Sequence, residues 1–220
     1  VKHAAAMYSC TDAMLLALKV LGVDKGDEII TTTFTFASTG HVICHHGAKP
    51  VFVDVDPETF NINPELIGEK ITPKTKGIIP VHYGGQSCDM DPIMDIASKH
   101  NLFVMEDAAH AIGTKYKGRK IGSIGDITCF SYYATKNLST AEGGMAVTNN
   151  EEWSNRMRIL SMYGISDARE IWHSRYSKAG AIHHDIVELG YKCNMTDICA
   201  GIGLHQLAKL DMFNLKREKF

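Results

Sequence analysis

One lysine stands on a short polar turn between an aromatic strand and a pair of glycines. Lys136 follows the segment Phe130–Tyr133 (FSYY) and precedes Gly143 and Gly144. We expect the tyrosines and the apolar strand to remove part of the water around this amine, which favours its neutral, nucleophilic form. Such an amine is what an enzyme that works through a Schiff base requires. Taken alone, the turn is also typical of a solvated surface lysine.

A second chemical group follows a strand upstream. The segment Leu102–Asp107 (LFVMED) reads as a buried strand that ends in two carboxylates, and His110 follows it. Ligands of parallel α/β sheets bind outside the carboxyl ends of the strands, so Asp107 is expected at the ligand edge. A lysine that anchors an aldehyde and an aspartate that keeps a pyridine nitrogen protonated are the minimum site for pyridoxal phosphate (PLP). The pair Lys136 and Asp107 therefore predicts PLP chemistry.

Strands and helices alternate along the chain, which predicts an α/β fold with a mostly parallel sheet and right-handed crossovers. β-branched runs bounded by turn residues indicate the strands, and capped apolar patterns indicate the helices. Pro80 is unusual inside a strand and predicts a bulge or a strand end there. The expected strands cover 27–34, 49–56, 77–82 and 102–107, and the expected helices cover 9–22, 35–46, 63–70, 92–100, 151–163 and 198–210.

Several ordered blocks of sequence resemble the DegT/StrS group of sugar-nucleotide aminotransferases, which belong to fold type I of the PLP enzymes. The resemblance implies a three-layer α/β/α domain around a mostly parallel sheet, the large PLP-binding domain of that fold. It extends over nearly the whole chain. The blocks are Ser9–Ala13, Gly26–Ile30, Pro50–Asp54, Pro80–Gln86, Glu106–Gly113, Tyr116–Ser123, Phe130–Tyr133, Thr135–Leu138, Glu142–Met145 and Leu189–Asp197.

The resemblance also assigns roles to residues around the cofactor. A helix that begins after Ser9 offers free backbone amides to a phosphate, and the family pattern implies contacts at Thr11 and Asp12. Ser131 would give its hydroxyl to the same phosphate. Phe36 would stack on the cofactor ring, although a core phenylalanine is about as well supported by the sequence alone.

Two further positions differ from the pattern that most relatives share. His110 stands where many relatives carry glutamine, so it could bond the cofactor's phenolic oxygen or orient Asp107. Lys192 stands where asparagine is common, in a loop that reaches the cofactor phosphate of the partner subunit. A lysine can still contact phosphate as a point charge. An exposed loop lysine is the competing interpretation.

The resemblance implies a PLP-dependent aminotransferase that moves an amino group from glutamate or glutamine to a keto sugar of a nucleotide-sugar. The active site would be shared within a homodimer, and the polar segment Gly164–Val187, expected to be a long loop, would help to form its sugar side. Relatives are longer, so residues 1–220 are expected to be the large domain without an N-terminal segment and the small C-terminal domain. Deoxygenating relatives usually carry histidine at the lysine position, and a non-catalytic cofactor-binding or regulatory fragment is the other alternative.

Composition narrows the class of protein further. The chain of 220 residues has 23 basic and 25 acidic side chains and no dense basic run, which predicts neither nucleic-acid nor membrane binding. Its six cysteines are scattered without CxxC spacing, so we expect reduced thiols and a cytoplasmic location. His41 and His45 share a helix face, but no third ligand follows at a recognisable spacing, so no metal site is predicted.

Overall fold

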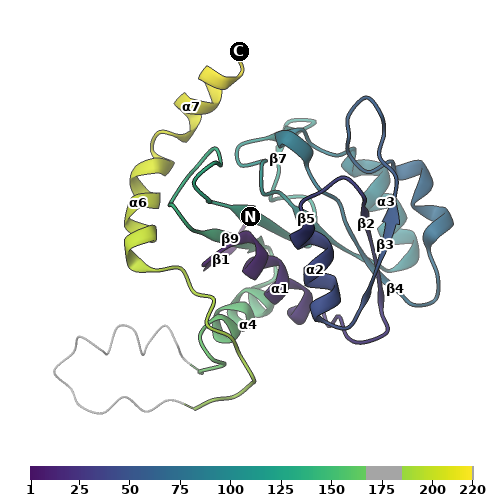
Figure 1. The fold of residues 1–220 in the computed structure, drawn as a ribbon, viewed down its shortest axis with the longest axis horizontal. Coiled ribbons are helices and arrows are strands. Elements are labelled where there is room, and N and C mark those ends of the chain that lie inside the picture. The colour runs from purple at the N-terminus through teal and green to yellow at the C-terminus, as the bar shows by residue number, and fades with distance from the viewer. Residues whose placement is uncertain (167–184, 220) are drawn as a thin grey trace.

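A seven-stranded sheet forms the middle layer of the protein in a computed structural model that describes residues 1–166 and 185–219 (Figure 1). The strand order is β1-β9-β8-β5-β4-β2-β3, and β9 is antiparallel to both of its neighbours, whereas the pairs from β8 to β3 are parallel. The strands are β1 His3–Met7, β2 Glu28–Thr32, β3 Lys49–Val53, β4 Thr75–Ile79, β5 Phe103–Asp107, β8 Ile127–Ser131 and β9 Gly144–Thr148. The predicted mostly parallel sheet is confirmed.

Helices cover both faces of this sheet, which makes three layers. On one face α1 (Cys10–Val20), α2 (Ala37–His45) and α4 (Glu151–Ser161) pack against one apolar cluster. On the other face lie α3 (Met90–His100) and the small hairpin of β6 (Lys115–Tyr116) and β7 (Arg119–Lys120). Neighbouring strand residues belong to different clusters because alternate side chains point to opposite faces: Ile29, Ile79, Met105 and Cys129 to the first, and Ile30, Ile78, Val104 and Phe130 to the second.

The carboxyl end of the sheet is where the chain departs from regular structure. β4 ends at Ile79, so Pro80 lies just beyond the strand. Of the bulge or strand end predicted at Pro80, the structure has the strand end. Its carbonyl accepts the backbone N–H of Asp107 at 2.9 Å. Asp107 is the last residue of β5, and Ser131 is the last residue of β8, the next strand in the sheet. These strand ends therefore bring a carboxylate and a hydroxyl to the same edge.

Three predicted elements are wrong in type or extent. Instead of a helix over 63–70, the chain forms two 3-10 turns, Pro64–Leu66 and Gly68–Lys70. The strand predicted as buried over 49–56 is β3 at the edge of the sheet, where Phe52 is 48% exposed. The helix predicted over 198–210 is divided into α6 (Asp197–Leu207) and α7 (Leu210–Arg217). The break turns Leu210 inward, where it is buried in the second apolar cluster.

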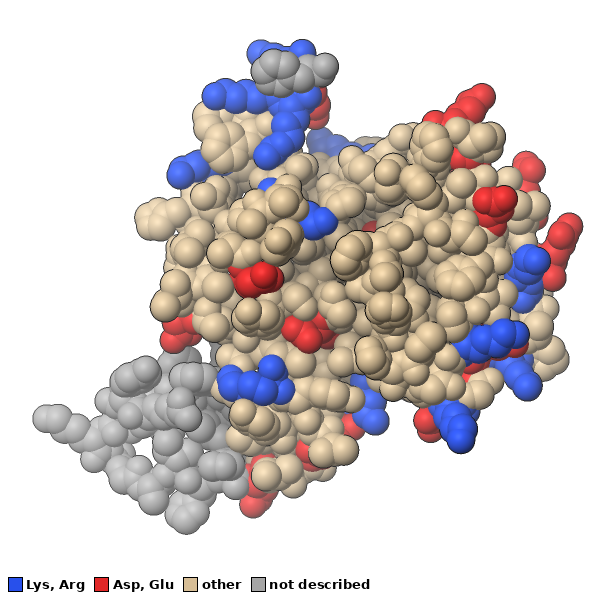
Figure 2. Space-filling view, in the orientation of Figure 1, with Lys and Arg blue, Asp and Glu red and all other residues tan. Residues whose placement is uncertain are grey.

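The last two helices extend from one side of the molecule (Figure 1). Thr196 caps α6, because its hydroxyl accepts the backbone N–H of Cys199. On the face in Figure 2, acidic and basic side chains are interspersed, and basic ones gather near the end of α7. No helix among residues 1–166 and 185–219 has the length and apolar character needed to cross a membrane. Most of the long loop predicted over 164–187 lies outside the described residues.

Candidate active site

A cavity of about 450 Å³ opens at the carboxyl edge of the sheet. This volume is within the range of about 300–1,000 Å³ that small-molecule sites occupy. Its walls come from the N-terminal ends of α1 and α2, the ends of β5 and β8, and the loops after β4 and β8. The residues that line it are Ser9, Cys10, Thr11, Met14, Thr35, Phe36, Ser38, Val81, His82, Tyr83, Asp107, Ala109, His110, Ser131, Tyr133, Thr135, Lys136 and Glu142.

The carboxylate of Asp107 is buried in this cavity and held by two donors. The hydroxyl of Thr39 on α2 donates to Oδ2 at 2.8 Å, and the backbone N–H of Ala109 donates to Oδ1 at 3.2 Å. Since the Thr39 hydrogen is committed to Asp107, the contact of 2.7 Å between Thr35 and Thr39 must have Thr35 as its donor. A chain of hydroxyls therefore orients a carboxylate that is only 3% exposed.

Lys136 belongs to a turn that is fixed at both ends. Its backbone N–H donates to the carbonyl of Tyr133 at 2.9 Å. The turn is closed by Tyr132, whose N–H donates to Gly143 at 2.8 Å and whose carbonyl accepts the N–H of Thr140 at 2.8 Å. Tyr132 is buried, and burial raises its pKa to about 12, so its hydroxyl stays protonated and uncharged at neutral pH. The amine of Lys136 and the carboxylate of Asp107 line one cavity.

The N-terminal end of α1 supplies unused backbone donors to the cavity. Within the described chain, the N–H groups of Cys10 and Thr11 have no hydrogen-bond acceptor, and both residues line the cavity. Ser131 contributes a hydroxyl close by. Gly144 on β9 makes this approach possible, since a Cβ there would lie 2.2 Å from the carbonyl carbon of Ser9. Free amides, a helix N-terminus and a hydroxyl are the groups that bind a phosphate.

Phe36 and His110 both line the cavity. Phe36 is 81% exposed, so the core interpretation of this phenylalanine is wrong, and its ring is open to a ligand. Partial burial, and then the positive charge of Lys136, hold the pKa of His110 below its usual value despite the opposing charge of Asp107. The imidazole of His110 is therefore neutral at pH 7. Burial raises the pKa of the Cys10 thiol, so that lining thiol also remains uncharged.

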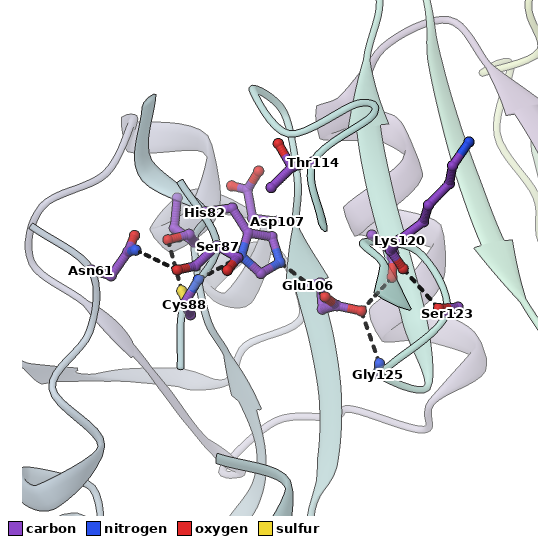
Figure 3. Close-up of polar contacts among 12 residues, drawn as sticks. Asn61, His82, Ser87, Cys88, Glu106, Asp107, Thr114, Lys120, Ser123 and Gly125 are labelled. Carbon is purple, nitrogen blue, oxygen red and sulfur yellow. Dashed lines mark hydrogen bonds and ion pairs between the residues drawn. The ribbon is translucent and has the colours of Figure 1, made fainter. Parts of the chain in front are cut away.

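A second polar network, around Glu106, adjoins the cavity through His82, which also lines it (Figure 3). Both Glu106 and His82 have fully buried side chains, and their atoms Oε2 and Nε2 are 2.9 Å apart. His82 Nδ1 accepts the backbone N–H of Cys88, so Nδ1 carries no proton and Nε2 must be the donor to Glu106. The other oxygen of Glu106 accepts bonds from Gly125 and Thr128 at 2.8 and 2.6 Å. The pair is thus a neutral histidine and a carboxylate with three donors.

This network connects the loop after β4 to β5 and β8. Burial raises the pKa of Glu106, but the bonds from His82, Thr128 and Gly125 outweigh that effect and hold the pKa below its usual value. Glu106 is therefore an ionised group inside the protein at neutral pH. Its position next to Asp107 in β5 makes it part of the support on which the cavity rests.

The structure brings six of the eight predicted site residues to one cavity and leaves two outside it. Thr11, Phe36, Asp107, His110, Ser131 and Lys136 line the cavity. Asp12 does not line it, because its N–H and carboxylate are both bonded to the Ser9 hydroxyl as part of the helix cap. Lys192 does not line the cavity either, since it is exposed and its amine contacts Asn194, Met162 and the ring of Tyr163.

Sequence reasoning missed Thr39 and Glu142. Thr39 belongs to a threonine-rich segment just after β2, and its position at the ligand edge of the sheet was the available signal. Glu142 lines the cavity from the turn that carries Lys136, directly before the two glycines. Its sequence position, six residues after the lysine, gave no indication that both side chains face the same space.

A larger cavity of about 770 Å³ on another part of the surface has a different character. Its lining includes four carboxylates, Asp56, Glu65, Asp89 and Asp95, and no lysine, arginine or histidine. Such a wall repels a phosphate and offers no amine for a Schiff base. The chemistry therefore points to the smaller cavity. Among the described residues, no group of three histidine, cysteine or acidic side chains is placed to hold a metal ion.

The model of the DegT/DnrJ/EryC1/StrS aminotransferase family matches residues 1–220. The chain belongs to this family. PLP is the cofactor of the family's aminotransferases, and a solved member, Spr1654, is known in apo, PLP and PMP forms. The fold type I architecture of solved members agrees with the three layers described above.

Three relatives show how similar this chain is to other members of the family. SpsC of Bacillus subtilis, a spore coat polysaccharide biosynthesis protein, is 53% identical over 99% of this chain and 55% of its own length. Spr1654 of Streptococcus pneumoniae, named as a sugar aminotransferase, has a TM-score of 0.90 at 37% identity, over 98% of this chain and 58% of its own. DesI, solved in the presence of its TDP-sugar product, has a TM-score of 0.83 at 32% identity, over 96% and 50%. The chain spans little more than half the length of the curated relatives it matches.

Proposed function

We propose that this protein is a PLP-dependent aminotransferase that moves an amino group from glutamate or glutamine to a keto sugar of a nucleotide-sugar. The observation that carries the proposal is the meeting of Lys136 and Asp107 in one cavity at the carboxyl edge of the sheet. The names of its relatives, a polysaccharide biosynthesis protein and sugar aminotransferases, support the class of substrate. Lys136 itself argues against the deoxygenating branch of the family, which usually has histidine there.

The residues present fit each part of the cofactor. The free N–H groups of Cys10 and Thr11 and the Ser131 hydroxyl would hold the phosphate. Asp107, with both oxygens already oriented by donors, would hold the ring nitrogen in its protonated form. The exposed ring of Phe36 would cover one face of the pyridine, and His110, which lines the same cavity, would meet the phenolic oxygen or Asp107.

Lys136 has two tasks in this mechanism. Its Nζ would anchor the cofactor through a covalent bond in the resting enzyme, and after the donor's amine has taken that place the released amine would carry a proton. Nζ would take the proton from the donor's α-carbon and hold it for return within the same half-reaction. PLP, when bound, supplies the electron sink that accepts the charge left on the α-carbon. The same steps in reverse order would aminate the keto sugar, which predicts ping-pong kinetics.

Further parts of the proposal concern the whole protein. We infer that residues 1–220 act as the PLP-binding large domain and that the active enzyme is a homodimer with a shared active site. Lys192 is exposed and does not line its own cavity, which supports a contact with the phosphate in a second copy. All six cysteines, each in the described residues, are free thiols, which supports a reducing compartment such as the cytoplasm.

The test is to load the purified protein with PLP, follow its absorbance before and after glutamate is added, and trap the lysine with borohydride. Wild-type protein should give an absorbance band that glutamate removes, with the reduced product on Lys136. Lys136→Ala should bind PLP weakly, lose the trapped product and lose turnover by at least about 1,000-fold. Lys120→Ala, at an exposed lysine of the β6-β7 hairpin, is the matched control and should behave as wild type. Wild-type turnover in Lys136→Ala would exclude the assignment.

A further inference from the structure

A single amide side chain on α7 bridges the two turns that carry Lys136 and His110. Asn214 Nδ2 donates to the carbonyl of Ile112 at 3.2 Å, and Asn214 Oδ1 accepts from Asn137 Nδ2 at 3.4 Å. Ile112 lies two residues after His110, and Asn137 lies one residue after Lys136. Asn214 is 77 residues from Asn137 and 102 residues from Ile112 along the chain, so only the tertiary structure brings the three together.

The chemistry of the neighbours fixes the orientation of this amide. A backbone carbonyl can only accept, so the NH2 group of Asn214 must face Ile112. A guanidinium can only donate, and Arg217 approaches the other end of the amide, Oδ1, at 3.5 Å. Both partners require the same orientation. Asn137 must then present its NH2 group to Oδ1, which leaves its own oxygen free.

Packing holds Asn214 in this place. Leu210, four residues earlier, lies on the same face of α7 and is buried in the apolar cluster that also contains Ala111 and Leu138, one from each bridged turn. Leu210 thus seats the helix, and Asn214 makes the polar contacts above it. Gly113 completes the fit, because a Cβ at that position, where φ is +91°, would lie 2.4 Å from Asn214 Nδ2.

We propose that Asn214 is a positioning residue that holds the Lys136 turn and the His110 turn in a fixed mutual arrangement. This inference rests on the proposed function, since the arrangement matters only if both turns contribute to the cofactor site. Asn214 does not line the cavity and acts through its neighbours. Loss of the bridge would leave each turn attached to its own strand but free to shift against the other. A shift of about 1 Å in a reacting group is enough to slow a reaction up to about 100-fold.

The first test measures the two turns without the cofactor. Hydrogen exchange of the full chain should show faster exchange in peptides covering 108–114 and 133–140 in Asn214→Ala. Lys216→Ala on the same helix, whose side chain makes no hydrogen bond in the described chain, should leave both peptides unchanged. If exchange in Asn214→Ala rises in neither turn, or in α7 alone, the bridge is not what holds the turns and the proposal fails.

The second test measures the reactivity of Lys136 towards PLP. At saturating PLP, borohydride trapping on Lys136 should be about 10-fold slower in Asn214→Ala, while the midpoint of thermal unfolding stays close to that of Lys216→Ala. Asn214→Asp keeps the acceptor for Asn137 but turns a carboxylate oxygen towards the Ile112 carbonyl, so it should be trapped at least as slowly as Asn214→Ala. Asn137→Ala combined with Asn214→Ala should be no slower than Asn214→Ala alone, because both remove one shared contact.

The outcomes separate this inference from the proposed function. If wild-type protein gives no trapped product on Lys136, the proposed function fails, and the exchange experiment still decides whether Asn214 holds the turns. If wild-type protein is trapped and Asn214→Ala is trapped at the same rate, the proposed function stands and the positioning role of Asn214 is overturned. Independent, additive losses in the double variant would overturn it as well.

Discussion

Glu106 and Asp107 are adjacent carboxylates with separate tasks, because consecutive residues of a strand point to opposite faces of the sheet. Asp107 faces α2 and the cavity, where Thr39 and Ala109 leave its outer edge open to a ligand. Glu106 faces the other side, and His82, Thr128 and Gly125 use its acceptor capacity. The carboxylate proposed to meet the cofactor is thereby backed by one whose bonds are all within the protein.

Replacement of Glu106 by glutamine tests this division. The amide would place an NH2 group against the Nε2–H of His82, or against Thr128 and Gly125, so we expect a loss of roughly 3 kcal/mol in the free energy of unfolding at pH 7. The pKa of Glu106 is lowered by folding, so its contribution is present above the unfolded value and is lost as pH falls through the folded pKa. Urea unfolding between pH 7 and pH 3 should therefore show the two proteins converging below about pH 4.5. A constant difference over that range would contradict the assignment of Glu106 as an ionised group.

At the scale of elements, the site depends on how closely α1 approaches β9. The helix begins at Cys10 after the Ser9 cap, and its first turn rests directly on Gly144, the first residue of β9. No other residue type leaves room there, since a Cβ would meet backbone atoms of Ser9 and Cys10 at 2.2 and 2.4 Å. The second glycine of the Gly-Gly pair is thus a requirement of helix-strand packing.

Gly144→Ala should consequently displace the first turn of α1. We expect a loss of about 1–3 kcal/mol in the free energy of unfolding, the usual cost of overpacking, together with weaker PLP binding from displaced phosphate donors. Equilibrium urea unfolding and a PLP titration measure the two effects. Gly68→Ala is the matched control, because a Cβ at Gly68 meets nothing within 4 Å and should change neither quantity. Unchanged PLP affinity in Gly144→Ala would show that the first turn of α1 does not bind the phosphate.

The chemistry of the site was more predictable from sequence than its supports. Lys136 and Asp107 could be placed because Asp107 ends one strand and Lys136 follows another. Strand ends of a parallel sheet meet at one edge. Thr39 and Asn214 could not, because their partners lie far along the chain and only the packed structure brings them together. Residues 63–70 look helical from their cap and proline, but the structure has two separate turns there, with Ile67 buried between them.

The division between α6 and α7 was also not predictable from the local sequence. Ala208 and Lys209 are good helix formers, so nothing local predicts a break between Leu207 and Leu210. The break occurs because it allows Leu210 to enter the apolar cluster of the main body, where it is 8% exposed. Tertiary packing outweighs local propensity at this point, and the same rotation places Asn214 over the two turns.

For the whole molecule, the cavity lies between segments that belong to both halves of the chain. α1 and α2 come from the first fifty residues, whereas the Ser131 and Lys136 side chains come from the far side of β5 in the sequence. A ligand that contacts all of them should stabilise the fold as a unit. Both apolar clusters share the central strands, so this stabilisation should appear in a single unfolding transition.

Thermal unfolding with and without PLP tests this expectation. At a PLP concentration 100 times the Kd, the free energy of unfolding should rise by about 2.7 kcal/mol, which for a chain of this size is a Tm increase of roughly 5–10 °C. Pyridoxal, which lacks the phosphate, should give a much smaller increase at the same concentration if α1 supplies the main anion site. Equal shifts with the two compounds would show that the phosphate contacts contribute little.

The antiparallel direction of β9 determines when the turn that carries Lys136 becomes ordered. Because β9 runs against β8, the turn that carries Lys136 leaves and re-enters the sheet at the same edge, and Tyr132 closes it through two backbone bonds of 2.8 Å. The conformational entropy of this loop is therefore lost when the hairpin forms, and not when a ligand arrives. Binding then has only to order side chains, so the affinity of the cavity is not reduced by the cost of closing the loop.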